Sequence, residues 1–197
     1  MKHLKKLFKG TCYAIVVVIL GIVISYFYLK STWKDVLTEQ EFNTLITAIK
    51  QAEDLPNAFY KLYEEEYPNA LNTSLNEQIV KGYFSDGFTK SPSILASIVS
   101  KYSRKDTDTT KISNKKAYVL AWKLEEETTQ KQCLNWALKN FQFTKEFKGI
   151  KDIEDYYFAK DVTQFTNNDF KLLITLIKKP SLVRLTPREH YIKKSAR

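Results

Sequence analysis

The sequence contains little cysteine, histidine or glycine, and each shortage excludes a class of protein. Only two cysteines occur among 197 residues, and Cys12 lies in an apolar segment apart from Cys133, so we expect no disulfide framework. Of the two histidines, only His190 falls in the predicted folded part, and one histidine with one cysteine predicts no metal site. The five glycines form no phosphate-binding loop or dinucleotide fingerprint, and without a nucleic-acid-binding module we expect no nucleic-acid partner.

Charge is missing from one long stretch near the N-terminus. No residue from Gly10 to Leu29 is charged, and about 20 apolar residues are needed to cross the hydrocarbon layer as a helix. Tyr26, Tyr28 and Trp33 cluster at the far end, where amphipathic rings prefer the headgroup region. We therefore predict a transmembrane helix at residues 11–29, with the lipid bilayer as its partner.

The charges beside this segment predict its orientation. Four lysines precede it, and the first acid is Asp35, so residues 1–10 are expected to be a cytoplasmic flank. The alternative is a cleaved signal peptide, whose apolar region would be shorter and would end in a small-x-small site. Bulky aromatic residues fill that place in Ser25-Tyr26-Phe27, which favours an uncleaved single-pass anchor.

Basic residues gather toward the C-terminus. The formal net charge is +9, from 31 Lys and Arg against 22 Asp and Glu. Between Lys171 and Arg197 eight bases face one acid, Glu189. Such a run attracts phosphate-bearing lipid or an anionic polymer, and it equally suits a solvated tail, which we place at residues 188–197.

The rest of the chain predicts helices. Capping residues or a proline at the first helical position are followed by apolar residues at helical spacing. We therefore predict an all-α domain over residues 30–187, with a β-hairpin near Gly82–Phe88 as an alternative for that loop. The polar stretch Arg104–Thr110 is expected to be a mobile loop. Helix starts are predicted at Thr38, Pro56, Ser74, Ser91, Ser113, Thr129 and Thr166.

The order of these helices resembles that of a known family, the glycosyltransferase family 51 domain of bacterial peptidoglycan polymerases. That family has a helix ending K-L-E, a helix of the type K-x-E-I-L-E-x-Y-L-N, a Y-F-G-K segment, an L-T-x-x-E-A helix and a proline-rich exit. The corresponding segments here are Val119–Glu125, Lys131–Lys139, Tyr157–Lys160, Thr166–Leu173 and Pro180–Pro187.

The resemblance implies a lysozyme-like helical fold, anchored in the cytoplasmic (inner) membrane with its domain in the periplasm or outside. In the family, one glutamate is the general base on the acceptor sugar hydroxyl of a lipid-linked precursor. A second carboxylate and basic residues help the lipid pyrophosphate leave, often with a divalent metal. The partners it implies are the lipid-linked peptidoglycan precursor, glycan strands and other envelope proteins. We expect no cofactor, and a divalent metal only if the chain is active.

The family's first motif, E-D-x-x-F-x-x-H, is altered here. If Tyr67 takes the place of the aromatic residue, Tyr63 takes the place of the catalytic glutamate. If Glu64 takes the place of the glutamate, Pro68 takes that of the aromatic, and neither register supplies the histidine.

The other two motifs are altered as well. The second, G-G-S-T-I-T-Q-Q, corresponds to Ser91–Ser97, which has lost both glutamines. In the third, R-K-x-x-E, Lys115 and Lys116 remain but Ala117 replaces the second glutamate. A non-catalytic relative is therefore the favoured hypothesis.

The candidate site residues each have an ordinary alternative. Glu64 is the candidate general base, and it also suits the solvated end of a helix within a run of three glutamates. Lys101, Lys115 and Lys116 are candidates for binding a pyrophosphate or the lipid precursor, and they equally suit a solvated surface. Glu125 matches a family position and equally suits a helix surface.

Three functions follow from the sequence. The favoured one is a membrane-anchored, transglycosylase-like subunit of cell-wall assembly with impaired catalysis, which binds glycan or lipid precursor or serves as a scaffold. The second is an active glycosyltransferase that polymerises lipid-linked disaccharide. The third is an unrelated, membrane-anchored helical interaction subunit of an envelope complex.

Overall fold

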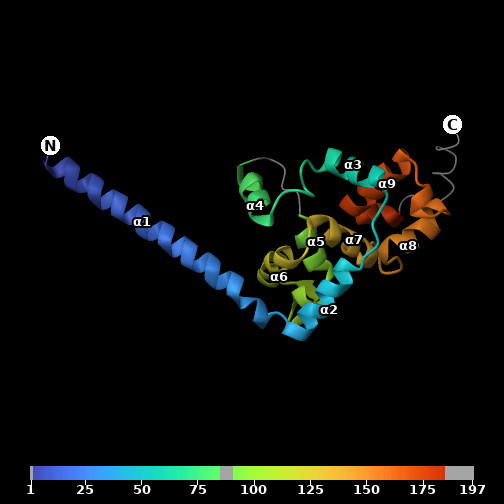
Figure 1. Ribbon diagram of the computed structural model, residues 1–197, viewed down its shortest axis with the longest axis horizontal. Coiled ribbons are helices and arrows are strands. Elements are labelled where there is room, and N and C mark those ends of the chain that lie inside the picture. Colours follow the sequence, from blue (N-terminus) through green and yellow to red (C-terminus); the bar gives the residue numbers. More distant parts are fainter. Residues whose placement is uncertain (1, 85–90, 185–197) are drawn as a thin grey trace.

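The computed structural model describes residues 2–84 and 91–184, which form one long helix and a domain of shorter helices (Figure 1). The α-helices are α1 (Lys2–Ser31), α2 (Glu39–Lys50), α3 (Asn57–Glu66), α4 (Leu75–Phe84), α5 (Pro92–Val99), α6 (Asn114–Glu127), α7 (Gln130–Asn140), α8 (Gly149–Ile153) and α9 (Asn167–Lys178). Short 3₁₀ or π turns are η1 (Thr32–Asp35), η2 (Lys101–Ser103), η3 (Glu154–Phe158), η4 (Val162–Gln164) and η5 (Pro180–Arg184). The all-α prediction is confirmed.

Helix α1 projects away from the domain and is long and apolar enough to cross a bilayer (Figure 1). Its large apolar side chains between Tyr13 and Ile24 are exposed, so the domain does not bury them. An apolar surface of this extent is stable in lipid rather than in water.

The last turns of α1 are attached to the domain through α4 and α6. Asn76 of α4 donates a hydrogen bond of 2.8 Å to the Tyr26 hydroxyl and accepts one of 2.7 Å from the Trp122 indole. The Tyr26 and Trp122 rings pack edge to face, 5.3 Å apart, and Lys30 pairs with Glu126 at 2.9 Å. These contacts hold the domain close to the end of the apolar helix.

Helix α5 packs between α6 and α7 at the centre of the domain. One core cluster joins α3, α7 and α9, and a second joins α2, α6 and α7. The helices begin where the sequence predicts, because the capping boxes at Thr38, Thr129 and Thr166 satisfy backbone N–H groups of the first turn.

One prediction was wrong. The stretch predicted as a mobile loop forms an antiparallel hairpin of β1 (Arg104–Lys105) and β2 (Asp108–Ile112), in which Lys105 pairs with Asp108. Threonine and isoleucine in β2 favour the extended conformation. Residues 85–90 and 185–197 lie outside the described residues, and with them most of the Gly82–Phe88 loop and the whole predicted tail at 188–197.

Asp169 closes the first turn of α9, and its charge is expected to stabilise the fold. Its carboxylate is 4% exposed and accepts hydrogen bonds from the Thr166 backbone N–H at 2.7 Å and the Lys160 ammonium at 2.6 Å. Burial acts to raise the pKa of Asp169, but the hydrogen bonds from Lys160 and Thr166 outweigh it and lower that pKa below 3.8. This charge therefore stabilises the fold above pH 3.8, and the effect is lost as pH falls through the lowered pKa.

We expect Asp169→Asn to lower the free energy of unfolding by about 1–2 kcal/mol at pH 7, and by less at a pH below the lowered pKa of Asp169, where wild type also loses the charge. Urea unfolding of the full-length protein in detergent, followed by circular dichroism at both pH values, measures this. The control Asp155→Asn changes an exposed carboxylate and should leave the stability as it is. A difference of equal size at both pH values would contradict the role of the charge.

Candidate functional site

Helix α3 and the residue that follows it carry a ladder of aromatic rings. Phe59, Tyr63 and Tyr67 follow at intervals of four residues, with ring centroids 5.8 Å and then 4.9 Å apart. Tyr63 is 3% exposed, and its burial raises the pKa of the phenol, which stays neutral. An uncharged, buried ring therefore occupies this point of the helix.

The predicted general base, Glu64, lies beside this ladder on a more exposed side of α3. It is half-buried, and its Oε1 accepts a hydrogen bond of 2.8 Å from the Asn72 side chain. Asn72 belongs to the turn that leads into α4. The carboxylate thus has one polar partner and partial access to solvent.

The three predicted pyrophosphate lysines lie on other elements. Lys101 is exposed in η2, with its ammonium 5.1 Å from the centre of the Tyr102 ring. Lys115 is exposed in the first turn of α6, and Lys116 pairs with Asp106 at 2.5 Å in the hairpin turn. In the described parts of the chain, no hydrogen bond or ion pair joins any of these lysines to the carboxylate of α3.

A carboxylate that the sequence left ambiguous is a centre of contacts. Glu125 near the end of α6 is half-buried and accepts hydrogen bonds from the Leu75 backbone N–H at 2.8 Å and from the Ser93 hydroxyl at 2.8 Å. Gln130 of α7 donates a third bond, of 2.5 Å, and accepts one of 2.9 Å from the Ser93 backbone N–H. Burial raises the pKa of Glu125 although these hydrogen bonds act to lower it.

This network joins four helices. Leu75 opens α4 and Ser93 lies in the first turn of α5, so the Glu125 carboxylate binds the N-terminal ends of both helices. Residue Gln130, in the first turn of α7, fixes the other side of the carboxylate. The match to the family's K-L-E segment was the sequence signal for Glu125, but its partners were not foreseen.

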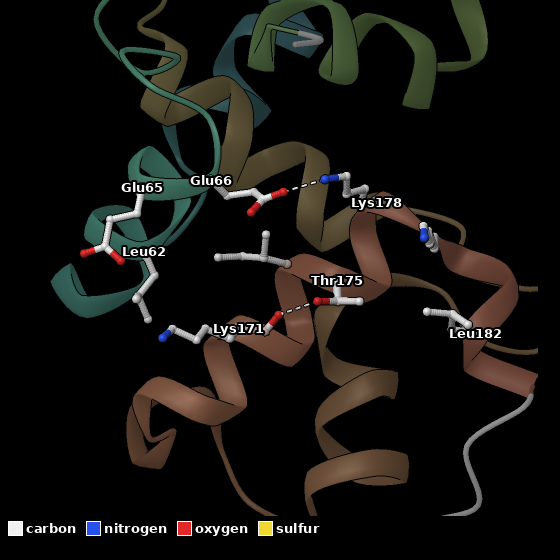
Figure 2. Close-up of a pocket in the computed structure, with 9 residues that line it drawn as sticks. Leu62, Glu65, Glu66, Lys171, Thr175, Lys178 and Leu182 are labelled. Carbon is white, nitrogen blue, oxygen red and sulfur yellow. Dashed lines mark hydrogen bonds and ion pairs between the residues drawn. The ribbon is translucent and has the colours of Figure 1, made fainter. Parts of the chain in front are cut away.

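An open groove of about 430 Å³ lies between α3 and α9 (Figure 2). Aliphatic side chains, Leu62, Ile174 and Leu182, form part of its lining. Figure 2 shows Glu66 and Lys178 meeting across it, with an ion pair of 2.5 Å. We call it the α3–α9 groove; its remaining lining residues are Glu65, Lys171, Thr175 and Lys179.

Comparison with protein families agrees with the helix order. The profile of the family described as Transglycosylase matches residues 44–197. The chain belongs to the transglycosylase family. This is the glycosyltransferase family 51 domain that the motifs resemble, so the protein is peptidoglycan glycosyltransferase-like. Comparisons with curated proteins and with solved structures find no match.

The aromatic ladder of α3 bears on which of the two registers of the first transglycosylase motif applies. The packing of Tyr67 on Tyr63 favours the register in which Tyr67 takes the place of the motif's aromatic residue. In that register the catalytic glutamate of a transglycosylase is replaced by Tyr63. Pro68, which the other register would place at the aromatic position of the motif, is exposed.

Two positions that the resemblance assigns to the other motifs, Ala117 and Ser97, are buried and uncharged. Ala117, in place of the second glutamate, is 2% exposed, and its carbonyl oxygen accepts a hydrogen bond of 2.7 Å from the Ser97 hydroxyl. Ser97 itself lies in the helix that corresponds to the second motif and is fully buried. The hydrogen bond between Ser97 and the Ala117 backbone thus joins α5 to the first turns of α6.

A divalent metal is held by several acidic, histidine or cysteine side chains that lie close together. Within residues 2–84 and 91–184, no three His, Cys, Asp or Glu side chains gather where they could bind an ion. Cys133 is buried, and burial raises the pKa of its thiol to about 12, so it is a neutral core residue.

Proposed function

We propose that this protein is a membrane-anchored transglycosylase-family subunit of cell-wall assembly that binds glycan strands or lipid-linked precursor without polymerising them. The observation that carries the proposal is the buried Tyr63 at the place of the catalytic glutamate. A phenol with a raised pKa cannot take a proton from a sugar hydroxyl near neutral pH.

The loss of the second carboxylate supports the same conclusion. Ala117 offers no charge to stabilise the departure of a pyrophosphate, and its methyl group is packed in the domain. Lys116, next to it, is already paired with Asp106. In this register, the positions of both catalytic carboxylates carry residues that cannot perform the family's reaction.

The location we propose is the inner membrane, with the N-terminus in the cytoplasm and the domain in the periplasm or outside. The length and apolar surface of α1 support an uncleaved anchor, and the lysines before it support this orientation. The contacts of Tyr26 with Asn76 and Trp122 join the end of the anchor to the domain, an arrangement that cleavage would discard.

An active glycosyltransferase is the second candidate, and one observation favours it. Glu64 is partly exposed and lies next to Tyr63, so the shifted register would give it the role of base, with lysines on the pyrophosphate. The third hypothesis, an unrelated helical subunit, is excluded by membership of the family.

Polymerisation of lipid-linked disaccharide by the full-length protein in detergent separates the two candidates. We expect the rate to be at least about 100-fold below that of an active family member in the same assay, because a positioned general base contributes on the order of 10²–10⁴. Glu64→Gln should leave this background unchanged, while binding to vesicles that contain the precursor should remain stronger than binding to vesicles without it, which α1 alone supports. Glycan made by wild type and lost in Glu64→Gln would establish the active enzyme instead.

A further inference from the structure

A second groove lies between α2, η2 and the end of α7, and we call it the α2–α7 groove. It has a volume of about 380 Å³ and includes none of the residues at the three motif positions. The residues that define its chemistry are Thr44, Lys101, Tyr102, Trp136, Asn140 and Lys148.

Two aromatic rings line this groove. Trp136 and Tyr102 are half-buried, and each packs one side against the core cluster formed by α2, α6 and α7. Within the described structure, neither the Trp136 indole N–H nor the Tyr102 hydroxyl has a hydrogen-bond partner. By contrast, the Trp122 indole donates to Asn76. The rings thus offer flat apolar faces together with polar groups that are available to a ligand.

The charge in the groove is positive. Lys101 and Lys148 are exposed, and neither forms an ion pair with another described residue, whereas no carboxylate lines the groove in that part of the chain. Two carboxylates lie outside the lining but close to these lysines: Asp152 accepts a hydrogen bond from the Lys148 backbone N–H, and the pKa of Glu41 is lowered mainly by hydrogen bonds from Thr38 and also by the charge of Lys101. In the α3–α9 groove, by contrast, lysines alternate with glutamates and Lys178 is paired with Glu66.

The position of Lys148 is fixed by the backbone. Lys148 forms an isolated antiparallel β-bridge with Gln142, and its backbone N–H donates a hydrogen bond of 2.7 Å to the Asp152 carboxylate. Gly149 follows with a φ of +76°, and a side chain there would meet the Lys139 carbonyl oxygen at 2.3 Å. Only glycine fits so close to α7, and this approach places Lys148 beside the end of that helix.

The outer face of α2 continues the groove with neutral polar groups. Thr44 and Ala48 are shared with a shallow hollow of about 700 Å³ whose other lining residues are Gln40, Asn43, Thr47 and Gln51. Thr44 and Thr47 donate their hydroxyls to helix carbonyls, which leaves oxygen lone pairs free to accept. No ionisable side chain lines this hollow in the described structure, although 27% of the residues in the chain are charged.

We propose that the α2–α7 groove and the adjoining face of α2 bind a glycan strand that carries carboxylates, at a site separate from the altered motifs. Sugar C–H faces pack on aromatic rings, sugar hydroxyls and acetamido groups exchange hydrogen bonds with amides and hydroxyls, and carboxylates pair with ammonium groups. The elongated, neutral face of α2 suits a polymer of polar rings better than a peptide, which requires apolar side-chain pockets. The identity of the polymer rests on the proposed function; the position of the site does not.

Isothermal titration of the full-length protein in detergent tests the site. The probe is uncrosslinked glycan strands stripped of peptide, which retain their lactyl carboxylates; chitohexaose, without carboxylates, and polyglutamate are the comparison ligands. We expect Trp136→Leu, which keeps apolar packing but loses the ring, to weaken strand binding by about tenfold or more. The double variant Lys101→Ser/Lys148→Ser should weaken strand binding by about five- to tenfold and leave chitohexaose unaffected.

The matched control is Lys171→Ser/Lys179→Ser, which removes the same charge from the α3–α9 groove and should bind strands as wild type does. The lysine variants change surface residues only, so they keep the test valid if Trp136→Leu does not fold. Strand binding that is absent in wild type, or equal in all variants, overturns the proposal. Preference for polyglutamate over strands overturns it in favour of an acidic protein partner. If the protein polymerises lipid-linked disaccharide and its strand binding still depends on Trp136, the proposed function is wrong but the binding site stands.

Discussion

Glu125→Ala is expected to lower the free energy of unfolding by about 3–5 kcal/mol. The change leaves three donors without their acceptor: the Leu75 backbone N–H, the Ser93 hydroxyl and the Gln130 amide. Each buried donor left unsatisfied costs about 1–3 kcal/mol, less what water entering the space restores. Urea unfolding of the full-length protein in detergent, followed by circular dichroism, measures the loss.

The neighbouring residue provides a matched control. Glu126 is more exposed and forms surface ion pairs with Lys30 at 2.9 Å and Lys123 at 2.7 Å. Glu126→Ala should therefore change the stability by no more than about 1 kcal/mol. Glu125→Gln keeps one acceptor oxygen and should fall between the two. Equal effects of the two alanine variants would show that the buried network does not hold α4 and α5 in place.

Local signals predicted the helices well because each signal acts within one turn. The capping boxes at Thr38, Thr129 and Thr166 use residues three positions apart, and all three form. The hairpin at residues 104–112 was not predicted because the polar composition of this stretch is typical of a loop. The three β-branched residues of Asp108–Ile112 (Thr109, Thr110 and Ile112) were a signal that could have predicted a strand.

The candidate site was less predictable because its contacts span the chain. Glu125 meets partners 50 and 32 positions away, and no local pattern encodes such pairs. Lys101 was a candidate pyrophosphate ligand together with Lys115 and Lys116, but the structure places it beside Tyr102, in a groove with α2 and α7. The first motif left two registers one residue apart, and the ring contacts of Tyr63 supply the packing that favours one of them.

Tyr63→Glu is expected to destabilise the domain by about 3–5 kcal/mol, whereas Tyr63→Phe should change its stability by no more than about 1 kcal/mol. The ring contacts Phe59 and Tyr67, and the hydroxyl makes no hydrogen bond to a described residue, so phenylalanine keeps what holds the position. A glutamate there would place a carboxyl group in an aromatic core without a partner. Urea unfolding of both variants in detergent measures the difference.

The pair of variants also tests the proposed loss of catalysis. Phe59 and Tyr67 surround position 63 with aromatic rings. If Tyr63→Glu does not fold, these surroundings exclude a general base at this position, in addition to the tyrosine that occupies it. Glu64, one residue on, keeps its access to solvent and its bond to Asn72 in both variants, so it reports on the register separately. A Tyr63→Glu protein that folds like wild type and polymerises lipid-linked disaccharide would mean that a cleft is open at this point. It would also mean that a single substitution, not the closing of the core, had silenced the reaction.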